Sequence, residues 1–422
     1  MEQYDVIVVG AGTAGLVAAI QAAREGCRVL LVERTGQPGG TMTSTMNCCP
    51  GLFHAWGRQI IAGIGWELVT ECADLSGTRL PDFTVPTGPG EHWKCQIALN
   101  PACYALLCDE KMTAARVNRL YHAMLAASQF DGRRWHLTLC TLAGLRSVQA
   151  EILLDCTGDA SAVALAGFER IIPEVCQPST LCCRLSGYDV NALDRKQLAE
   201  AARHAMAEGH LRTTDLGWDA NDFGMLFLAN YGGNANHIFG PSAAQADNRS
   251  RLEIEARASV LRAYRFLRGQ RGLENLFLEQ VAPETGVRES ATIAGEHQIT
   301  AEEYVSGCRY PDAVCHGYYP LDMHEKSTAG VTPKPLQQGI VPQIPLRALI
   351  PRGSRNLLVA GRCLSSDHVA NSALRVQAMA MATGQAAGAA AALAVRSGVT
   401  PLDVDFPELQ KILRRHGAIV PE

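Results

Sequence analysis

The sequence predicts an α/β protein built on a doubly wound, Rossmann-like domain that is discontinuous in sequence and carries an inserted α+β domain. Three observations predict this architecture. The chain opens with a short apolar run, a glycine-rich turn and a helical segment, which is how a parallel sheet with crossover helices begins. Between about residues 166 and 339 polar helical stretches and prolines dominate. Residues 356–393 then return to an apolar strand and a long small-residue helix.

Each element follows from its local pattern. The β-branched run at residues 4–9 and the apolar run at residues 29–32 predict strands on either side of a helix at residues 16–24. Two further strands, at residues 136–141 and 147–154, flank the turn residues Ala143 and Gly144 and predict a meander, with residues 117–127 as its candidate third member. Residues 195–207 and 252–267 predict helices in the inserted region.

These segments divide the 422 residues into four expected parts. The discontinuous domain takes residues 1–165 and 340–400, the insertion takes residues 166–339, and residues 401–422 form a terminal helix and tail. A chain of this length fits one large domain or two.

The amino-acid composition limits the class of protein and the kinds of partner we expect. Hydrophobic residues make up 47% of the chain and charged residues 19%, which is typical of a globular protein. The net charge of −4 provides no global positive field for a phosphate backbone, so nucleic acid is disfavoured as a partner. The uncharged run at residues 376–395 contains Gln377, Thr383 and Gln385, and we expect a buried helix there, not a membrane span.

The cysteines and the N-terminus predict a cytoplasmic protein. Fifteen cysteines is an odd number, and it includes the adjacent pairs Cys48-Cys49 and Cys182-Cys183, which fits thiols in a reducing compartment better than a disulfide framework. The start of the chain carries Glu2 and Asp5 and does not resemble a secretory signal.

The first turn carries a dinucleotide fingerprint in its proper context. Gly10, Gly12 and Gly15, with Thr13 and Ala14 between them, follow a strand and open a helix. The first glycine allows the tight turn, the second lets the backbone approach a pyrophosphate, and the third lets helix and strand pack closely. The helix N-terminus favours the phosphate charge.

The end of the second predicted strand supplies the acid that this motif requires. Glu33, 23 residues after Gly10 and directly before Arg34, is placed to accept the hydroxyl protons of an adenosine ribose and would repel a 2′-phosphate. The sequence therefore predicts a dinucleotide cofactor without that phosphate.

Several segments identify which dinucleotide. Residues 4–45, including Gly39-Gly40-Thr41, resemble the N-terminal signature of FAD-dependent oxidoreductases of the fumarate reductase and glutathione reductase superfamily, and ILLDCTGDA at residues 152–160 resembles their second signature. Residues 287–300, 319–325 and 356–393 resemble a bacterial subgroup of these flavoproteins. The resemblance implies FAD as the cofactor, held in part by Gly39, Gly40, Thr41, Thr157, Gly158 and Asp159.

The flavin itself is expected at the C-terminal helix. Reduced flavin gains negative charge near N1 and O2, and a helix N-terminus at Val376 and Gln377 would stabilise that charge. Gly361 allows close backbone approach, and Arg362 is a candidate to reach the ribityl chain or the pyrophosphate.

Two motifs that are missing from the sequence limit the reactions we expect. No second strand-associated glycine fingerprint occurs, so we expect no built-in NAD(P)H site. Where related thiol reductases carry their two redox cysteines, this chain has Met42 and Asn47. We expect Cys48 and Cys49 to be packing thiols. Potential metal ligands occur at Cys308, Cys315, His316 and His324, but their spacing matches no closed zinc site, and no metal is expected.

The candidate catalytic residues are His324, His368 and Arg288. Hydride transfer to flavin usually needs a proton removed from the substrate. Asp322 could orient His324 only if the loop expected there folds sharply. His368 occupies the position of a dicarboxylate-binding histidine in fumarate reductases, but the arginine position four residues on is Ser372, with Arg375 one turn further. Arg288 lies in an Arg-Glu-Ser run typical of the subgroup.

The expected function is hydride transfer between a small organic substrate and flavin N5, with reoxidation by oxygen, a quinone or a carrier protein. The inserted domain would cover the flavin. The alternatives are a flavin-dependent tRNA-modifying enzyme and a non-catalytic flavin-binding electron relay. A second copy of the chain or an electron-acceptor protein stays open as a partner.

Overall fold

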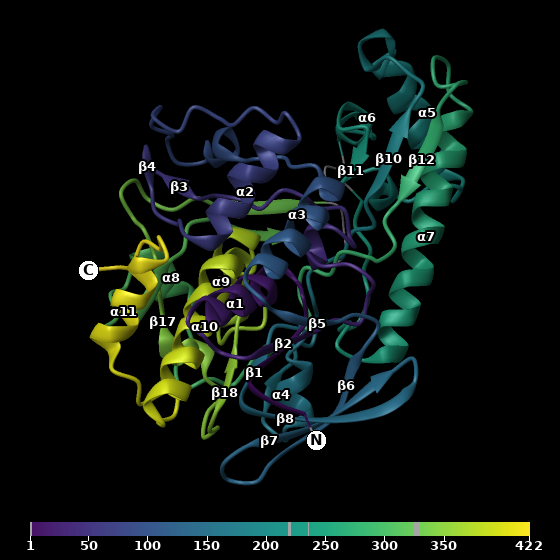
Figure 1. The fold of residues 1–422 in the computed structure, drawn as a ribbon. Helices are drawn as coiled ribbons and strands as arrows, with labels where there is room; N and C mark the ends of the chain where they lie inside the picture. Colours follow the sequence, from purple (N-terminus) through teal and green to yellow (C-terminus); the bar gives the residue numbers. More distant parts are fainter. Residues whose placement is uncertain (1, 218–220, 235, 325–329) are drawn as a thin grey trace.

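The main sheet of the computed structural model has a parallel core (Figure 1). The structure describes residues 2–217, 221–234, 236–324 and 330–422. Strand β1 lies between β2 and β8, and all three are parallel; β5 extends the sheet beyond β2, and β18 pairs with β8. The bounds are β1 (Glu2–Val9), β2 (Val29–Val32), β5 (Asn118–Leu120), β8 (Gly144–Asp155) and β18 (Leu357–Val359). The N- and C-terminal segments therefore share one sheet.

Strand β8 connects the parallel core to an antiparallel meander. Its first half pairs with β7 (Trp135–Thr141), which pairs with β6 (Met124–Phe130). Its last residues pair with β18. The predicted third strand at residues 117–127 is in fact two strands, β5 and β6, because the chain turns at His122, where φ is 52°.

Helices α1 (Thr13–Arg24) and α10 (Gln377–Ser397) pack closely against each other. A Cβ atom at Gly384 would lie 2.2 Å from the Ala14 carbonyl oxygen, and one at Gly388 would lie 2.3 Å from that of Ala18. The small residues of α10 therefore set the distance between the helices. Among the described residues α10 is long and apolar enough to cross a membrane, and 94% of its most apolar window is buried inside the protein.

Other helices and short sheets surround this core. The helices are α2 (Ile64–Leu75), α3 (Pro101–Ala114), α4 (Ser161–Leu165), α8 (Ala301–Ser306), α9 (His368–Leu374) and α11 (Phe406–Arg415). The short strand pairs are β3 (His54–Ala55) with β4 (Arg58–Gln59), β9 (Arg170–Ile171) with β13 (Thr292–Ile293), β14 (Ala313–His316) with β17 (Gln343–Pro345), and β15 (Leu321–His324) with β16 (Val331–Lys334).

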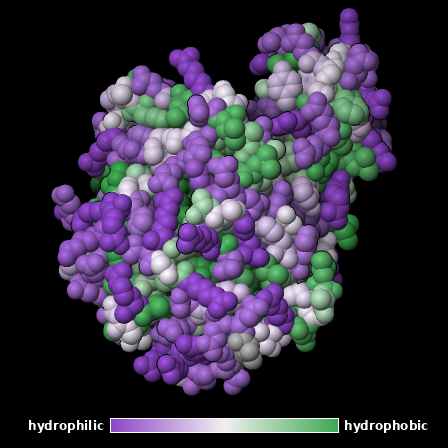
Figure 2. All heavy atoms as spheres, in the orientation of Figure 1, coloured by the Kyte–Doolittle hydropathy of each residue, from purple (hydrophilic) through white to green (hydrophobic). Residues whose placement is uncertain are grey.

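A second, separate cluster of buried apolar residues lies between Leu181 and Val287. Its elements are β10 (Cys183–Ser186), β11 (Gly232–Gly233), β12 (Phe277–Val281), α5 (Arg195–Ala207), α6 (Met225–Ala229) and α7 (Ala246–Arg268). In Figure 1 they stand together at the upper right, and an indentation separates their surface from that of the main body in Figure 2. Buried residues from 293 to 350 belong to the first core, although the sequence analysis assigned residues up to 339 to the insertion. The domain boundaries stay a prediction.

Candidate functional site

A cavity of about 1560 Å³ runs from the glycine-rich turn after β1 to the N-terminus of α10. This is larger than the roughly 300–1,000 Å³ of a pocket for one small ligand. Its wall contains most of the residues predicted to bind the cofactor: Gly10, Gly12, Thr13, Ala14, Glu33, Arg34, Gly40, Thr41, Thr157, Gly158, Asp159, Gly361, Arg362, Val376 and Gln377. The cavity therefore has room for a dinucleotide and a substrate together.

The glycines of the first turn serve two purposes: one allows close packing of helix and strand, and another leaves space open toward the cavity. A Cβ at Gly15 would lie 1.8 Å from the Gly10 carbonyl oxygen, so Gly15 lies in the close contact between helix and strand and not in the cavity wall. The Cβ position at Gly12 meets no atom within 4 Å, so this residue opens onto the cavity. Gly12 also precedes α1, which begins without a side-chain cap or an acidic residue in its first turn. The free end of the helix suits a phosphate.

The loop at residues 39–42 closes against this turn. The Gly39 amide donates to the Ala11 carbonyl oxygen at 2.8 Å, and a Cβ at Gly40 would lie 2.8 Å from the Gly12 Cα. Gly39 has φ of 103° and supports the loop from outside the cavity wall. Thr41, in the 3-10 turn Gly40–Met42, lies in the wall.

Glu33 is buried at the end of β2 and organises the turn. One carboxylate oxygen accepts from the Ala11 amide at 2.7 Å, and the other accepts from the amide and hydroxyl of Thr35 at 2.8 and 2.9 Å. Arg34 points instead to Glu284, with which it forms an ion pair. The acid lies where the fingerprint requires it, and its side chain is already held in place.

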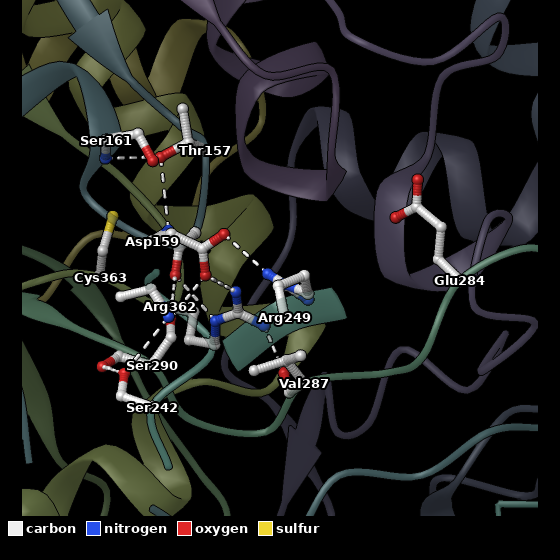
Figure 3. Close-up of polar contacts among 12 residues, drawn as sticks. Thr157, Asp159, Ser161, Ser242, Arg249, Glu284, Val287, Ser290, Arg362 and Cys363 are labelled. Carbon is white, nitrogen blue, oxygen red and sulfur yellow. Dashed lines mark hydrogen bonds and ion pairs between the residues drawn. The ribbon is translucent and has the colours of Figure 1, made fainter. Parts of the chain in front are cut away.

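The second signature forms a turn fixed by a buried aspartate. Asp155 ends β8 and accepts from the Thr157 amide and hydroxyl at 3.0 and 2.7 Å and from the Val163 amide at 2.9 Å. The Thr157 hydroxyl in turn accepts from the Ser161 amide at 3.1 Å (Figure 3). This network places Gly158, at φ of 75°, and Asp159 in the cavity wall.

Asp159 is the centre of a charge cluster shown in Figure 3. It accepts from Arg362 at 2.7 Å, from Arg249 at 2.9 Å and from the Ser290 hydroxyl at 2.5 Å. Burial opposes ionisation of this carboxyl, but the two guanidinium groups outweigh it and lower its pKa. Arg362 also donates to the carbonyl oxygens of Gly158 and Val287. The arginine predicted to reach the cofactor is therefore held by the protein, and Arg249 joins it from α7.

The N-terminus of α10 forms the far wall of the cavity. Val376 precedes the helix, and the helix has no side-chain cap and no acidic residue in its first turn. The Ala378 amide donates to the Pro50 carbonyl oxygen at 2.7 Å, and the Gln377 side chain donates to that of Asn47 at 3.2 Å. These bonds fix the helix end against the loop that follows Thr41.

Beyond this helix end the cavity wall carries charged residues from separate segments. Arg375 donates to the Asp322 carboxylate and carbonyl oxygen, both at 3.3 Å, and to the Ser372 carbonyl oxygen at 3.0 Å. Burial opposes ionisation of Asp322, but the hydrogen bond from His324 and the charge of Arg375 hold its pKa well below the usual range. The Ser372 hydroxyl accepts from the Asp322 amide at 3.0 Å, so Ser372 and Arg375 both contact Asp322.

His324 is held from both sides. Its Nε2 lies 3.2 Å from the Asp322 carboxylate, and its Nδ1 lies 2.8 Å from Nε2 of His237. Asp322 reaches it without the sharp loop that the sequence analysis required, because both residues lie in β15, where positions i and i+2 share a face. Burial and nearby Arg288 lower the pKa of His324 to about 4 and that of His237 to about 2. Both rings are neutral at pH 7.

Arg288 and Tyr319 complete this end of the wall. Arg288 donates to the Pro178 carbonyl oxygen at 2.8 Å, to the Thr180 hydroxyl at 2.7 Å and to the Asn234 side chain at 2.8 Å. Burial, with Arg375 nearby, lowers its pKa to about 10. Burial and the charge of Asp322 raise the pKa of Tyr319, so its phenol stays protonated.

His368 occupies a different place from the one its predicted role requires. It does not belong to the cavity wall, because it begins α9 and its Nδ1 is directed to the buried Glu289 at 2.5 Å. Its contact with a substrate stays a prediction.

The cysteines show no redox pairing. All fifteen lie in described segments and none forms a disulfide. Burial raises the pKa of Cys48 and of Cys49, so both stay protonated although both line the cavity. Within the described residues no group of three or more His, Cys, Asp or Glu side chains is arranged to hold a metal ion.

Sequence reasoning missed two contributors to this end. Tyr319 begins the segment that resembled the bacterial subgroup, so its position was available as a signal. His237 is an isolated histidine in the predicted insertion, and no local pattern marks it as a neighbour of His324.

Comparison with known proteins identifies the family. Residues 5–413 match the family described as FAD dependent oxidoreductase. Prolycopene isomerase 2, chloroplastic, from an Oncidium hybrid cultivar is 55% identical over 90 residues, which cover 20% of this chain and 15% of that protein. The chain therefore spans only a small part of the curated relatives it matches.

Two solved structures align over most of the chain. A geranylgeranyl bacteriochlorophyll reductase-like protein from Thermoplasma acidophilum is 14% identical over 98% of this chain and 83% of its own, with a TM-score of 0.45. The p-nitrophenol 4-monooxygenase of Pseudomonas putida is 12% identical over 99% and 84%, with a TM-score of 0.42. The open Cβ position at Gly12, the buried acid at Glu33 and the N-terminus of α10, which has no side-chain cap, all fit FAD. By the match across residues 5–413, the chain belongs to the FAD dependent oxidoreductase family, and FAD is its cofactor.

Proposed function

We propose that this protein transfers a hydride between a small organic substrate and FAD, at the end of the cavity that is lined by Arg288, Tyr319, Asp322, His324 and Arg375. The observation that carries the proposal is the continuity of the cavity. The same wall joins the dinucleotide loops to this buried group of ionisable side chains. Perturbed ionisable groups that share a cavity with a cofactor site are typical of catalytic centres.

The cofactor would be held at three places. The backbone of the turn at Gly12 and the N-terminus of α1 face the phosphates, Glu33 faces the adenosine ribose, and the N-terminus of α10 faces the flavin. Bound FAD supplies a two-electron hydride acceptor or donor. The inserted region between Leu181 and Val287 contributes Arg249 and Thr285 to the wall, which supports its role as a cover over the cofactor.

Asp322 is the better candidate for proton removal than His324. Both ring nitrogens of His324 have partners, so a proton could reach this ring only after one of them moves. The Oδ2 atom of Asp322 accepts from His324 and Arg375, which fixes the carboxylate and keeps it ionised. When an alcohol loses hydride, the protonated carbonyl that results is a far stronger acid than this carboxyl. An aspartate of low pKa is therefore a sufficient base.

The remaining side chains position the substrate. The Tyr319 phenol is protonated and can donate a hydrogen bond to a substrate oxygen. Tyr304, which is buried, holds Tyr319 through both backbone groups: its hydroxyl accepts from the Tyr319 amide at 3.0 Å and donates to the Tyr319 carbonyl oxygen at 2.9 Å. Arg288 and Arg375 add positive charge to the same wall.

The test is an anaerobic screen of the holoprotein against small alcohols, amines and hydroxy acids, and of the chemically reduced protein against activated alkenes. Bleaching of the flavin absorbance by one class, or its return with an alkene, supports the proposal. Asp322→Asn should slow this exchange about 10²-fold or more, whereas Asp312→Asn should not, because Asp312 is paired with Arg347 outside the cavity wall. No exchange with any compound, together with reduction by a partner protein, would contradict the proposal and favour an electron relay.

Reoxidation of the reduced protein by oxygen, a quinone or a carrier protein is part of the same proposal. Comparing the rates at which each restores the flavin absorbance identifies the acceptor. A cytoplasmic location is also proposed; fifteen cysteines of which none forms a disulfide support a reducing compartment. The family match does not favour a tRNA-modifying enzyme.

A further inference from the structure

We call the end of the cavity that is lined by Arg288, Tyr319, Asp322, His324 and Arg375 the substrate end. Its described side chains carry more positive than negative charge. Arg288 and Arg375 both line it, and among the carboxylates of the described residues only Asp322 lines it near them. Glu289 also lies near Arg375, but its oxygens are directed to His368 and to the Gln177 amide at 3.0 Å, and it is not in the cavity wall. The neutral ring of His324 adds no charge at pH 7.

Arg375 also carries a donor without an acceptor. Only 8% of its side chain is exposed, and its Nη1 atom is buried with no hydrogen-bond partner in the described part of the chain. Its other nitrogens donate to Ser372 and Asp322. A buried guanidinium that is partly unpaired is unfavourable unless an acceptor completes its hydrogen bonds, and a carboxylate is a stronger acceptor than a neutral oxygen.

Arg288 differs from Arg375 in this respect. Its guanidinium donates to three protein oxygens, so its hydrogen bonds are largely used while its charge still acts at short range. Arg375 therefore offers a direct contact, and Arg288 raises the local potential.

We propose that the substrate carries a single carboxylate, which Arg375 binds through Nη1 while Arg288 stabilises it electrostatically. This inference rests on the proposed function and adds the substrate class to it. One carboxylate matches the single surplus positive charge, and an oxygen acceptor matches the unpaired Nη1. Asp322 would then face the part of the substrate that loses its proton.

The experiment measures binding and not turnover. The purified holoprotein, in buffer without added chloride, is titrated with benzoate and acetate and with their uncharged amides, benzamide and acetamide. Heat release and the shift of the flavin absorbance both report binding. Arg375→Met removes the charge, Arg375→Lys keeps a charge but loses the planar pair of donors, and Arg347→Met is a matched control at a guanidinium paired with Asp312 outside the cavity wall.

We expect at least one carboxylate to bind wild-type protein at least tenfold more tightly than its amide, and Arg375→Met to weaken that binding by about tenfold to a hundredfold. Arg375→Lys should lose less carboxylate affinity than Arg375→Met, and Arg347→Met should keep the wild-type affinity. A second measurement guards against misfolding: carboxylate should raise the thermal unfolding temperature of wild type and of Arg347→Met, but not of Arg375→Met.

Three results would overturn the inference: equal binding of amides and carboxylates, no binding of either carboxylate, or unchanged affinity in Arg375→Met. These results are distinguishable from failure of the proposed function. If an uncharged compound bleaches the flavin while no carboxylate binds, the inference fails and the function stands. If carboxylates bind through Arg375 but no compound in the screen exchanges hydride, the function fails and the anion site stands.

Discussion

The two ends of the cavity each hold two arginines and one aspartate, but they differ in how far the protein completes the hydrogen bonds of these groups. At the dinucleotide end, Asp159 is bound by Arg362, Arg249 and Ser290, so its charge is matched within the protein. At the substrate end, the Nη1 atom of Arg375 has no hydrogen-bond acceptor in the described part of the chain. The charges of Arg375 and Arg288 both act on the single carboxylate of Asp322. Among the described residues, neither Arg362 nor Arg249 has a buried nitrogen without a hydrogen-bond partner, whereas Arg375 does. We therefore expect a ligand to complete the hydrogen bonds of the second charge cluster and not those of the first.

The largest expected effect concerns the packing under the dinucleotide end. Gly15→Ala would place a methyl group 1.8 Å from the Gly10 carbonyl oxygen, and a backbone atom in a packed turn has little room to move. We expect a loss of about 3 kcal/mol or more of unfolding free energy, measured by chemical denaturation of the FAD-free protein. A wild-type midpoint for this variant would show that the turn is not packed as described.

The matched charge cluster should be the next most sensitive feature. Asp159→Asn would leave Arg362 and Arg249 without their carboxylate, and the three side chains are only 17–25% exposed. We expect a destabilisation of roughly 2–3 kcal/mol, allowing for this partial exposure. A double variant, Asp159→Asn with Arg249→Met, should recover part of the loss, because it removes one of the two unmatched charges. Additive losses would argue against a shared cluster.

At the substrate end, removing the aspartate should strengthen the binding of a carboxylate ligand. Asp322→Asn removes the negative charge that partly balances Arg375 and Arg288. We therefore expect carboxylate probes to bind about tenfold more tightly, even though hydride exchange slows. Weaker carboxylate binding in Asp322→Asn would mean that Asp322, and not the arginines, directs the anion.

These contrasts also explain what could be predicted from the sequence. The dinucleotide end was predictable, because Gly10, Gly12, Gly15 and Glu33 lie within one strand–helix–strand unit whose local geometry fixes their functions. The substrate end draws its residues from segments around positions 237, 288, 319–324 and 375. These segments meet through the packing of α9 against β15 and the contact of His237 with His324. Local patterns therefore predicted a substrate contact for His368, which is not in the cavity wall, and missed His237.

The acid sensitivity of the substrate end is expected to be small for each step in pH and to accumulate as the pH falls. His324 and His237 have pKa values lowered to about 4 and about 2, whereas in the unfolded chain a histidine has a pKa of about 6.5. Between those values the unfolded state binds more protons, so the stability present above pH 6.5 is lost as the pH falls toward 4. Each buried ring contributes at most about 1.4 kcal/mol per pH unit.

Denaturation at pH 7, 6 and 5 measures this slope. His237→Gln keeps a donor toward His324 but cannot titrate, so its slope should be shallower than that of wild type. His204→Gln, which removes a ring from an exposed position on α5, should keep the wild-type slope. Equal slopes in all three proteins would show that the buried histidine pair does not govern the pH response.

The most direct test of the account is the FAD content of Gly12→Ala. Its methyl group would meet no protein atom within 4 Å and would project into the space assigned to the pyrophosphate. Gly240→Ala also adds a methyl group that meets no atom within 4 Å, but away from the cavity wall. After acid precipitation, wild type and Gly240→Ala should release FAD into the supernatant, and Gly12→Ala should release little, while its FAD-free form unfolds like that of wild type. Full FAD content in Gly12→Ala would contradict the placement of the cofactor in this cavity.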